Sequence, residues 1–351
     1  MSGEVIRTVD SIVGVGSATR LAIRSATNGR ENNEDDYLVF DLRPDLDAPP
    51  VTILSIADGM GGLEHGELAS RETLRKLGLS LFEQFTFGRR TNGVAGPVTA
   101  RELETMLLNA VQEANAHVKR MVNVNRWGKA GSTVVAVAVT GAAAVVVNMG
   151  DSPLFRLRAD ADTLERLTDD HTIAGIALRA GLITSRMARV HEGRSRLEYY
   201  IGGSAMPRTA PIRTFDLAPG DILLLCSDGI SGAVSEDQIH DILKDAGSHL
   251  SEAADHLLHA SIEAGETDNQ TVILWKYVPL HRPPALELLD ATPVDDTPGV
   301  GRTDRSISLL ATVSDHVHRT IGRVEATNGV SNAAEDAGRT DSSQHRGSER
   351  D

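Results

Sequence analysis

Apolar positions along this chain form two kinds of pattern, continuous or alternating runs and runs at helical spacing. The first kind predicts strands at residues 17–25, 37–42, 51–57, 133–139, 143–149, 154–158, 222–226 and 270–276. The second kind predicts helices over 67–85, from 99 to about 121, and over 251–264. Periodicity alone therefore indicates a domain of mixed strands and helices.

Two helix starts are marked by capping boxes. In one, Thr99 and Glu102 can satisfy each other's backbone amides, and Ser235 and Gln238 repeat the arrangement before a helix that runs to about Ala246. Between residues 168 and 210 the pattern is mixed, with short helices expected around 173–180 and 185–190.

The composition changes after about residue 280. Proline, aspartate, threonine, serine and glycine dominate from there on, and no aromatic residue follows Tyr277. Such a segment lacks the apolar residues needed for a core. The sequence therefore predicts a folded domain at 1–280 and a mostly disordered C-terminal tail at 281–351.

Charge and cysteine content indicate which binding partners and which cellular compartment suit this chain. The 351 residues carry a formal net charge of −14, with a pI near 5.3, which argues against nucleic acid or an anionic membrane as partner. The single cysteine, Cys226, excludes an internal disulfide and suits a reducing cytosol. No signal peptide is evident, and the longest apolar stretch, 134–147, is too short to span a bilayer. We expect a cytoplasmic protein.

Five acidic clusters recur at strand ends or beside glycines. They are Glu34-Asp35-Asp36, Asp58-Gly59, Gly150-Asp151, Asp228-Gly229 and Asp268-Asn269. Carboxylates that converge in this way repel one another unless cations neutralise them. Oxygen ligands favour hard divalent ions, so the pattern predicts a metal site. Arg30 lies four residues before Glu34, and its guanidinium suits a phosphate dianion.

The order of these motifs is specific. The chain contains Arg30-x-x-Asn33-Glu34-Asp35, Ala57-Asp58-Gly59-Met60-Gly61-Gly62, Ala130-Gly131-Ser132-Thr133, Met149-Gly150-Asp151-Ser152, Cys226-Ser227-Asp228-Gly229 and Asp268-Asn269. This series resembles the metal-dependent protein phosphatase family, also called protein phosphatase type 2C, in its bacterial form. The resemblance covers about residues 10 to 278.

The resemblance implies a fold and a set of roles. The fold is α+β, an α/β/β/α sandwich of two antiparallel sheets flanked by helix pairs, with 1–280 as the catalytic domain. Two Mn²⁺ or Mg²⁺ ions, and a third weaker one, would be bound by Glu34, Asp35, Asp58, Gly59, Asp151, Asp228 and Asp268. Within that set Asp58 would bridge the two core ions, Gly59 would contribute its carbonyl, and Asp35 would act directly or through water. Arg30 would bind the substrate phosphate, so that Arg30, Asp58 and Asp228 would carry the catalysis.

The implied function is that of a protein serine/threonine phosphatase. Its binuclear centre would activate a water for direct hydrolysis of phosphoserine and phosphothreonine on proteins, acting on targets of a serine/threonine kinase in signal transduction. Two alternatives stay open. One is a phosphatase of a phosphorylated anti-sigma-factor antagonist, and the other is a catalytically weak member that acts as a binding module. The oligomeric state is left open.

Three residues bear on the source of protons. Eukaryotic members carry a histidine where this chain has Met60, so the proton for the leaving group must come from elsewhere, for example from metal-bound water. His171 and His191 are candidates because they lie near the expected flap at 175–205. The flap diverges from the bacterial pattern at 194–202. Cys226 is not followed by the arginine that a cysteine-based phosphatase needs, and we expect it to be a buried strand residue.

Overall fold

The computed structural model describes residues 6–12, 19–43, 48–60, 65–89, 96–207, 211–247 and 249–279. All of them lie in the first of two units into which the chain divides, residues 1–283. The predicted tail at 281–351 lies outside the described residues. Among the described helices, none is both long enough and apolar enough to cross a bilayer.

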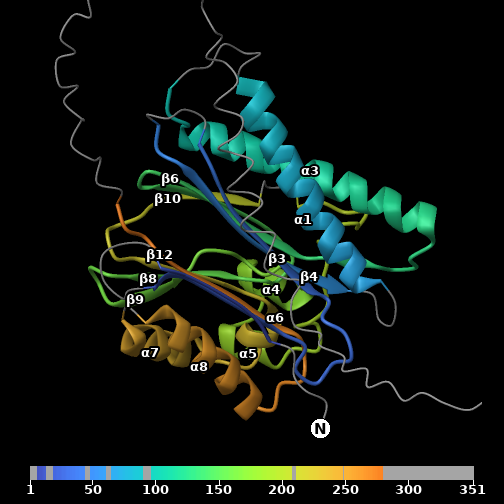
Figure 1. Ribbon diagram of the computed structural model, residues 1–351. Helices are drawn as coiled ribbons and strands as arrows, with labels where there is room; N and C mark the ends of the chain where they lie inside the picture. Colours follow the sequence, from blue (N-terminus) through green and yellow to red (C-terminus); the bar gives the residue numbers. More distant parts are fainter. Residues whose placement is uncertain are drawn as a thin grey trace, which may run out of the picture. The chain divides into compact units, whose positions relative to one another are not determined.

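Two antiparallel six-strand sheets form the centre of the domain (Figure 1). The first sheet has the order β1 (Ile6–Ile12), β2 (Thr19–Ala26), β12 (Gln270–Lys276), β11 (Ile222–Cys226), β8 (Leu154–Arg158) and β9 (Thr163–Arg166). The second has the order β10 (Ile212–Asp216), β7 (Ala143–Met149), β6 (Val134–Thr140), β4 (Val51–Met60) and β3 (Asp35–Leu42), and the short β5 (Gly131–Ser132) pairs with β4.

Helices cover the outer face of each sheet. The helices α1 (Gly66–Glu83) and α3 (Ala100–Asn125) pack on the second sheet, and the π-helix η1 (Gln84–Gly88) continues α1. The helices α7 (Glu236–Ala246) and α8 (Leu250–Glu263) pack on the first sheet. Three shorter helices, α4 (Ile173–Arg179), α5 (Ser185–Arg189) and α6 (Asp228–Ser231), follow strands or loops. The predicted four-layer sandwich is confirmed.

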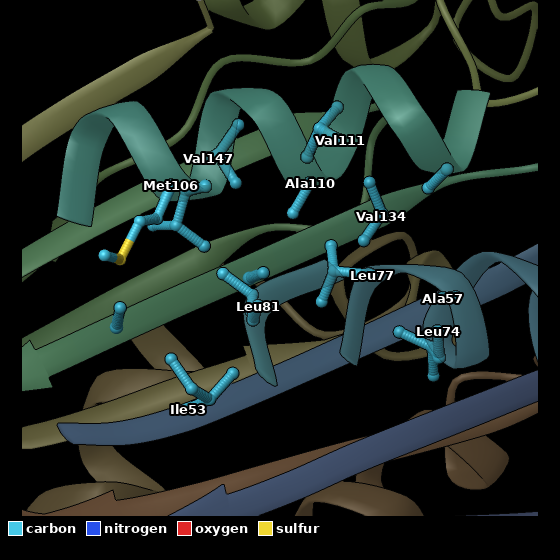
Figure 2. Packing of buried hydrophobic residues seen from close by; sticks show 14 of the residues in the cluster. Ile53, Ala57, Leu74, Leu77, Leu81, Met106, Ala110, Val111, Val134 and Val147 are labelled. Atoms are coloured by element: carbon cyan, nitrogen blue, oxygen red, sulfur yellow. The ribbon is translucent and has the colours of Figure 1, made fainter. Parts of the chain in front are cut away.

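The central strands, such as β4, β6 and β11, are apolar almost throughout because each of their faces is buried in a different core. In β6, Val134, Ala136 and Ala138 contact the core under α1 and α3, whereas the residues between them contact the core between the sheets. Figure 2 shows this outer core, where Leu77 and Leu81 of α1 lie over the sheet near Ile53. A sheet covered on both sides selects near-continuous apolar runs, and these runs made the strands predictable.

Both capping boxes are confirmed, at the starts of α3 and α7. The expected short helices are present as α4 and α5. Four strands were not predicted: β1, β5, β9 and β10. The expectation that the strand at 51–57 ends before Asp58 was wrong, because β4 continues to Met60 and pairs through this residue.

Candidate metal centre

The hydrogen-bond register of β3 and β4 brings the first two acidic motifs together. Asp35 lies directly opposite Asp58, and the Gly59 amide donates to the Glu34 carbonyl over 3.1 Å. A β-carbon on Gly59 would lie 2.2 Å from the Gly66 carbonyl oxygen, so only glycine permits this approach. The glycine after Asp58 therefore lets β4, the Glu34 segment and the start of α1 meet.

The first sheet contributes two of the other three motifs. Asp228 begins α6 two residues after the end of β11, and Asp268 lies two residues before β12. The Ser227 hydroxyl donates to a buried Asp35 oxygen over 2.7 Å and thereby joins the two sheets. A β-carbon on Gly229 would lie 2.0 Å from the Asn269 carbonyl oxygen, which explains glycine there.

Asn269 organises the loop that carries Arg30 and Glu34. Its side-chain oxygen accepts from the Glu34 amide over 2.8 Å, and its side-chain nitrogen donates to the carbonyls of Thr27 and Asn32. The sequence placed Asn269 in an acidic motif but gave it no role. The sequence offered only the position of an asparagine directly after an aspartate, and its burial is a finding of the structure.

Residues between β5 and β6 fix the backbone of Asp58. Its amide donates to the Thr133 hydroxyl oxygen over 3.0 Å, and its carbonyl accepts from the Thr133 amide over 2.8 Å. The Thr133 hydroxyl also bonds to that of Ser152 over 2.7 Å, and Ser152 follows Asp151. Thr133 of the Ala130–Thr133 motif therefore links the backbone of Asp58 to the residue that follows Asp151.

Burial and mutual repulsion raise the pKa values of the gathered carboxyl groups. Burial raises the pKa of Asp35 to about 7 and that of Asp228 to about 6, and the charge of Asp268 adds to both. The same causes hold the pKa of Asp58 and of Asp151 well above the ordinary range. Asp228 is the largest charge acting on Asp151, so the structure also brings this predicted pair together.

Glu34 and Arg30 lie at the rim of the site. Burial raises the pKa of Glu34, Glu67 adds to the rise, and Arg30 opposes it. Arg30 is 55% exposed and donates to an Asp268 carboxylate oxygen over 2.8 Å. The predicted phosphate ligand and a predicted metal ligand are thus paired with each other.

The residues present fit a pair of hard divalent ions. All donors are oxygens, and one oxygen of Asp35 is buried without a hydrogen-bond partner. The charge of Asp228 raises the pKa of Asp58, so the two carboxyl groups lie close enough to repel each other, and a proton or a cation must neutralise them. Among the described residues, no group of three aspartate, glutamate, histidine or cysteine side chains is arranged closely enough to hold one metal ion.

The two candidate histidines have other contacts. The Gly150 amide donates to Nδ1 of His171 over 3.2 Å, and the His171 amide donates to the Gly150 carbonyl over 2.9 Å. Burial, with a smaller effect of the charge of Arg179, lowers the pKa of His171 to about 4, so the ring is neutral near pH 7. His191 accepts from the Gly193 amide within the flap. Neither arrangement supports the hypothesis of a histidine proton donor.

Cys226 is a buried free thiol on β11, as expected, and burial raises its pKa to about 12. A thiol in this environment is not a nucleophile at neutral pH. Cys226 therefore gives the site no nucleophile.

A family model described as Protein phosphatase 2C matches residues 26–264, which include all the predicted site residues except Asp268. The chain belongs to the protein phosphatase 2C family. The resemblance inferred from six ordered motifs is therefore confirmed, including its bacterial type, because bacterial phosphatases are among its relatives.

Individual relatives agree with the family model. The serine/threonine phosphatase stp of Listeria welshimeri is 33% identical over 251 residues, which cover 70% of this chain and 90% of that protein. The crystal structure of the Mycobacterium tuberculosis serine/threonine phosphatase PstP/Ppp aligns with a TM-score of 0.59 at 28% identity, covering 74% of this chain and 98% of that one. A PstP catalytic domain in complex with two manganese ions aligns at 0.54 and 25% identity, covering 78% and 97%.

Proposed function

We propose that this chain is a protein serine/threonine phosphatase that uses two Mn²⁺ or Mg²⁺ ions to hydrolyse phosphoserine and phosphothreonine on proteins. The observation that carries the proposal is the convergence of carboxylates from both sheets on Asp35 and Asp58 in a member of the protein phosphatase 2C family. The relatives named as serine/threonine phosphatases, and the manganese bound to one of them, support it.

The proposed ligands divide by sheet. Asp58 and the Gly59 carbonyl would serve both core ions, while Asp228 and Asp268 would hold the first. Glu34 would serve the second, with Asp35 beside it, and Asp151 would hold a third ion together with Asp228. When bound, such ions supply Lewis-acid chemistry, since they lower the pKa of a water and neutralise phosphate charge.

The chain's own residues position these groups and the substrate. Ser227, Thr133 and Asn269 hold Asp35, Asp58 and Glu34 in place through the hydrogen bonds described above. Arg30 is exposed at the rim, where its guanidinium can accept a phosphate dianion in place of the Asp268 carboxylate. Asp268 would then be free to bind metal. Arg30 would thus exchange the Asp268 carboxylate for the substrate phosphate.

Three finer points belong to the proposal. The substrates are proteins phosphorylated by a serine/threonine kinase, which places the enzyme in signal transduction. The enzyme works in the cytoplasm, a proposal supported by its single, reduced cysteine. Catalysis resides in 1–280, and the tail at 281–351 lies outside the catalytic domain.

The test is hydrolysis of a phosphothreonine peptide by the full chain. We expect turnover with Mn²⁺, its loss in EDTA, and its loss on Asp228→Asn. Asp245→Asn is the matched control, because Asp245 is an exposed carboxylate on α7 and should leave turnover unchanged. A folded, Mn²⁺-loaded protein without turnover, or an active Asp228→Asn variant, would contradict the proposal.

A further inference from the structure

A hollow of about 530 Å³ is lined by none of the proposed metal ligands, although His171 of its lining contacts Gly150, next to Asp151. Its lining comes from β7, from the segment between β9 and α4, from α4 and the flap, and from β10. The volume is within the range of ligand pockets. We call it the arginine pocket, defined by Arg166, Arg179 and Arg213 together with His171 and Asn148.

The charge in the arginine pocket is positive although the chain as a whole is acidic. Three guanidinium groups face a single lining carboxylate, Asp169, which pairs with Arg179 over 3.3 Å at the surface. The side chain of Arg213 is exposed, and no hydrogen bond or ion pair joins it to another described residue. Arg166 pairs with Asp170 and, over 3.7 Å, with Glu236, but its Nε is buried without a partner. Guanidinium groups that keep unused donors beside a hollow favour anionic oxygen groups.

The adjoining flap has the same sign of charge. Between Ile173 and Tyr200 there are five arginines against two glutamates, while the whole chain carries −14. Arg179 comes from α4 at the start of this segment and lines the pocket. A basic hollow continuous with a basic segment suits an acidic stretch of polypeptide.

The arginine pocket is connected to the proposed metal centre through His171. The His171 carbonyl accepts from the amides of Glu198 and Tyr199 in the flap, and its amide and ring bond to Gly150, next to Asp151. Arg166 is close enough to Asp151 to act on it electrostatically. An anion in the pocket would therefore lie a short distance along a bound peptide from the reacting phosphate.

We propose that the arginine pocket binds a second anionic group of the substrate, a phosphate or carboxylate on a residue near the phosphorylated residue being hydrolysed. The proposal rests on the phosphatase activity proposed above and deepens it, because it assigns the enzyme a preference for multiply phosphorylated or acidic protein segments. Arg213 and Arg179 are the binding residues, and Arg166 forms the inner wall.

The experiment compares peptides with the full chain in Mn²⁺. One phosphothreonine peptide has neutral flanks, and a series adds a phosphoserine or a glutamate at successive positions on either side. For the best spacing we expect a KM about tenfold lower with kcat unchanged. Arg213→Ala and Arg179→Ala should remove this preference while p-nitrophenyl phosphate and the singly phosphorylated peptide react as with the unaltered enzyme.

Arg71→Ala is the matched control, since Arg71 is an exposed arginine on α1 and does not line the pocket. Absence of the preference in the unaltered enzyme, or its survival in the Arg179→Ala/Arg213→Ala double variant, would overturn the proposal. If the singly phosphorylated peptide is not hydrolysed at all, the phosphatase proposal has failed instead, so the two failures are distinguishable.

Added inorganic phosphate tests whether the arginine pocket binds an anionic group of the substrate or the free phosphate that the reaction releases. At concentrations too low to inhibit hydrolysis of p-nitrophenyl phosphate, added phosphate should leave the preference intact, because a tethered group has a high effective concentration. If such phosphate abolishes the preference, the pocket is a site for free phosphate and the assignment to substrate is wrong.

Discussion

Arg30 donates a hydrogen bond to Asp268 over 2.8 Å and so joins the predicted phosphate ligand to a predicted metal ligand. The pair is partly exposed, so it contributes little to the stability of the fold. Its interest is functional, because the guanidinium can hold either a protein carboxylate or a phosphate. Metal binding to Asp268 and phosphate binding to Arg30 would therefore each break the hydrogen bond between these two residues.

This contact predicts that Arg30 and Asp268 have separable effects. Arg30→Ala should raise KM for a phosphopeptide about tenfold, since a charge-assisted hydrogen bond to phosphate is lost. Its Mn²⁺ affinity should not fall, because removal of a cation beside Asp268 leaves the carboxylate more available. Asp268→Asn should weaken Mn²⁺ binding instead. Peptide kinetics and calorimetric Mn²⁺ titration measure the two effects.

Arg30→Lys is the control, because lysine keeps the positive charge but lacks the planar guanidinium that binds phosphate through two hydrogen bonds. Its KM should lie between those of the unaltered enzyme and of Arg30→Ala. Weaker Mn²⁺ binding by Arg30→Ala would contradict the exchange of partners. It would show instead that the guanidinium supports Asp268 as a ligand.

Asn269 is predicted to hold the metal loop in place. Asn269→Ala removes three part-buried hydrogen bonds, to the Glu34 amide and to the carbonyls of Thr27 and Asn32, at a cost of about 0.5–1.5 kcal/mol each. We expect a lower melting temperature and a weaker Mn²⁺ affinity together. Asn109→Ala, which removes one exposed contact at 3.3 Å to Gln84, should change neither. Unaltered Mn²⁺ binding in Asn269→Ala would refute this role.

The role of Asn269 shows where prediction from sequence ends. The central strands and the carboxylates could be predicted because their signals are local, namely apolar runs and Asp-Gly pairs. The edge strands β9 and β10 are four and five residues long and largely exposed or half-buried, so they lack such runs. The contacts of Asn269, Ser227 and Thr133 depend on which strands meet in the fold, and spacing along the chain does not encode that.

The raised carboxyl pKa values predict a pH dependence for the metal-free protein. Asp35 at about 7 and Asp228 at about 6 bind protons in the folded state that an ordinary aspartate, with a pKa of 3.8, has lost. Their contribution to stability is therefore fully present below about pH 3.8 and is lost progressively as the pH rises from there to about 6 for Asp228 and about 7 for Asp35. The lowered pKa of His171 has the opposite sign and offsets part of this below pH 6.5.

Mn²⁺ competes with those protons, so its stabilising effect should grow with pH. The rise in melting temperature on adding saturating Mn²⁺ should be larger at about pH 8 than at about pH 5. Differential scanning fluorimetry in EDTA and in Mn²⁺ measures it. An equal Mn²⁺ effect at both values would mean that the carboxyl groups titrate normally in the metal-free protein.

His171 is predicted to position the Asp151 loop as a neutral acceptor and not to supply a proton. His171→Gln keeps an acceptor for the Gly150 amide, so it should retain kcat within about tenfold and leave the shape of the pH–rate profile unchanged. His171→Ala leaves that buried amide unpaired, which should cost about 1–3 kcal/mol of stability. Chemical denaturation and the pH dependence of kcat provide the measurements. With a pKa of about 4, His171 does not titrate in the alkaline range and cannot cause an alkaline limb of the pH–rate profile. If such a limb disappears in His171→Gln, His171 is a general acid and the prediction is wrong.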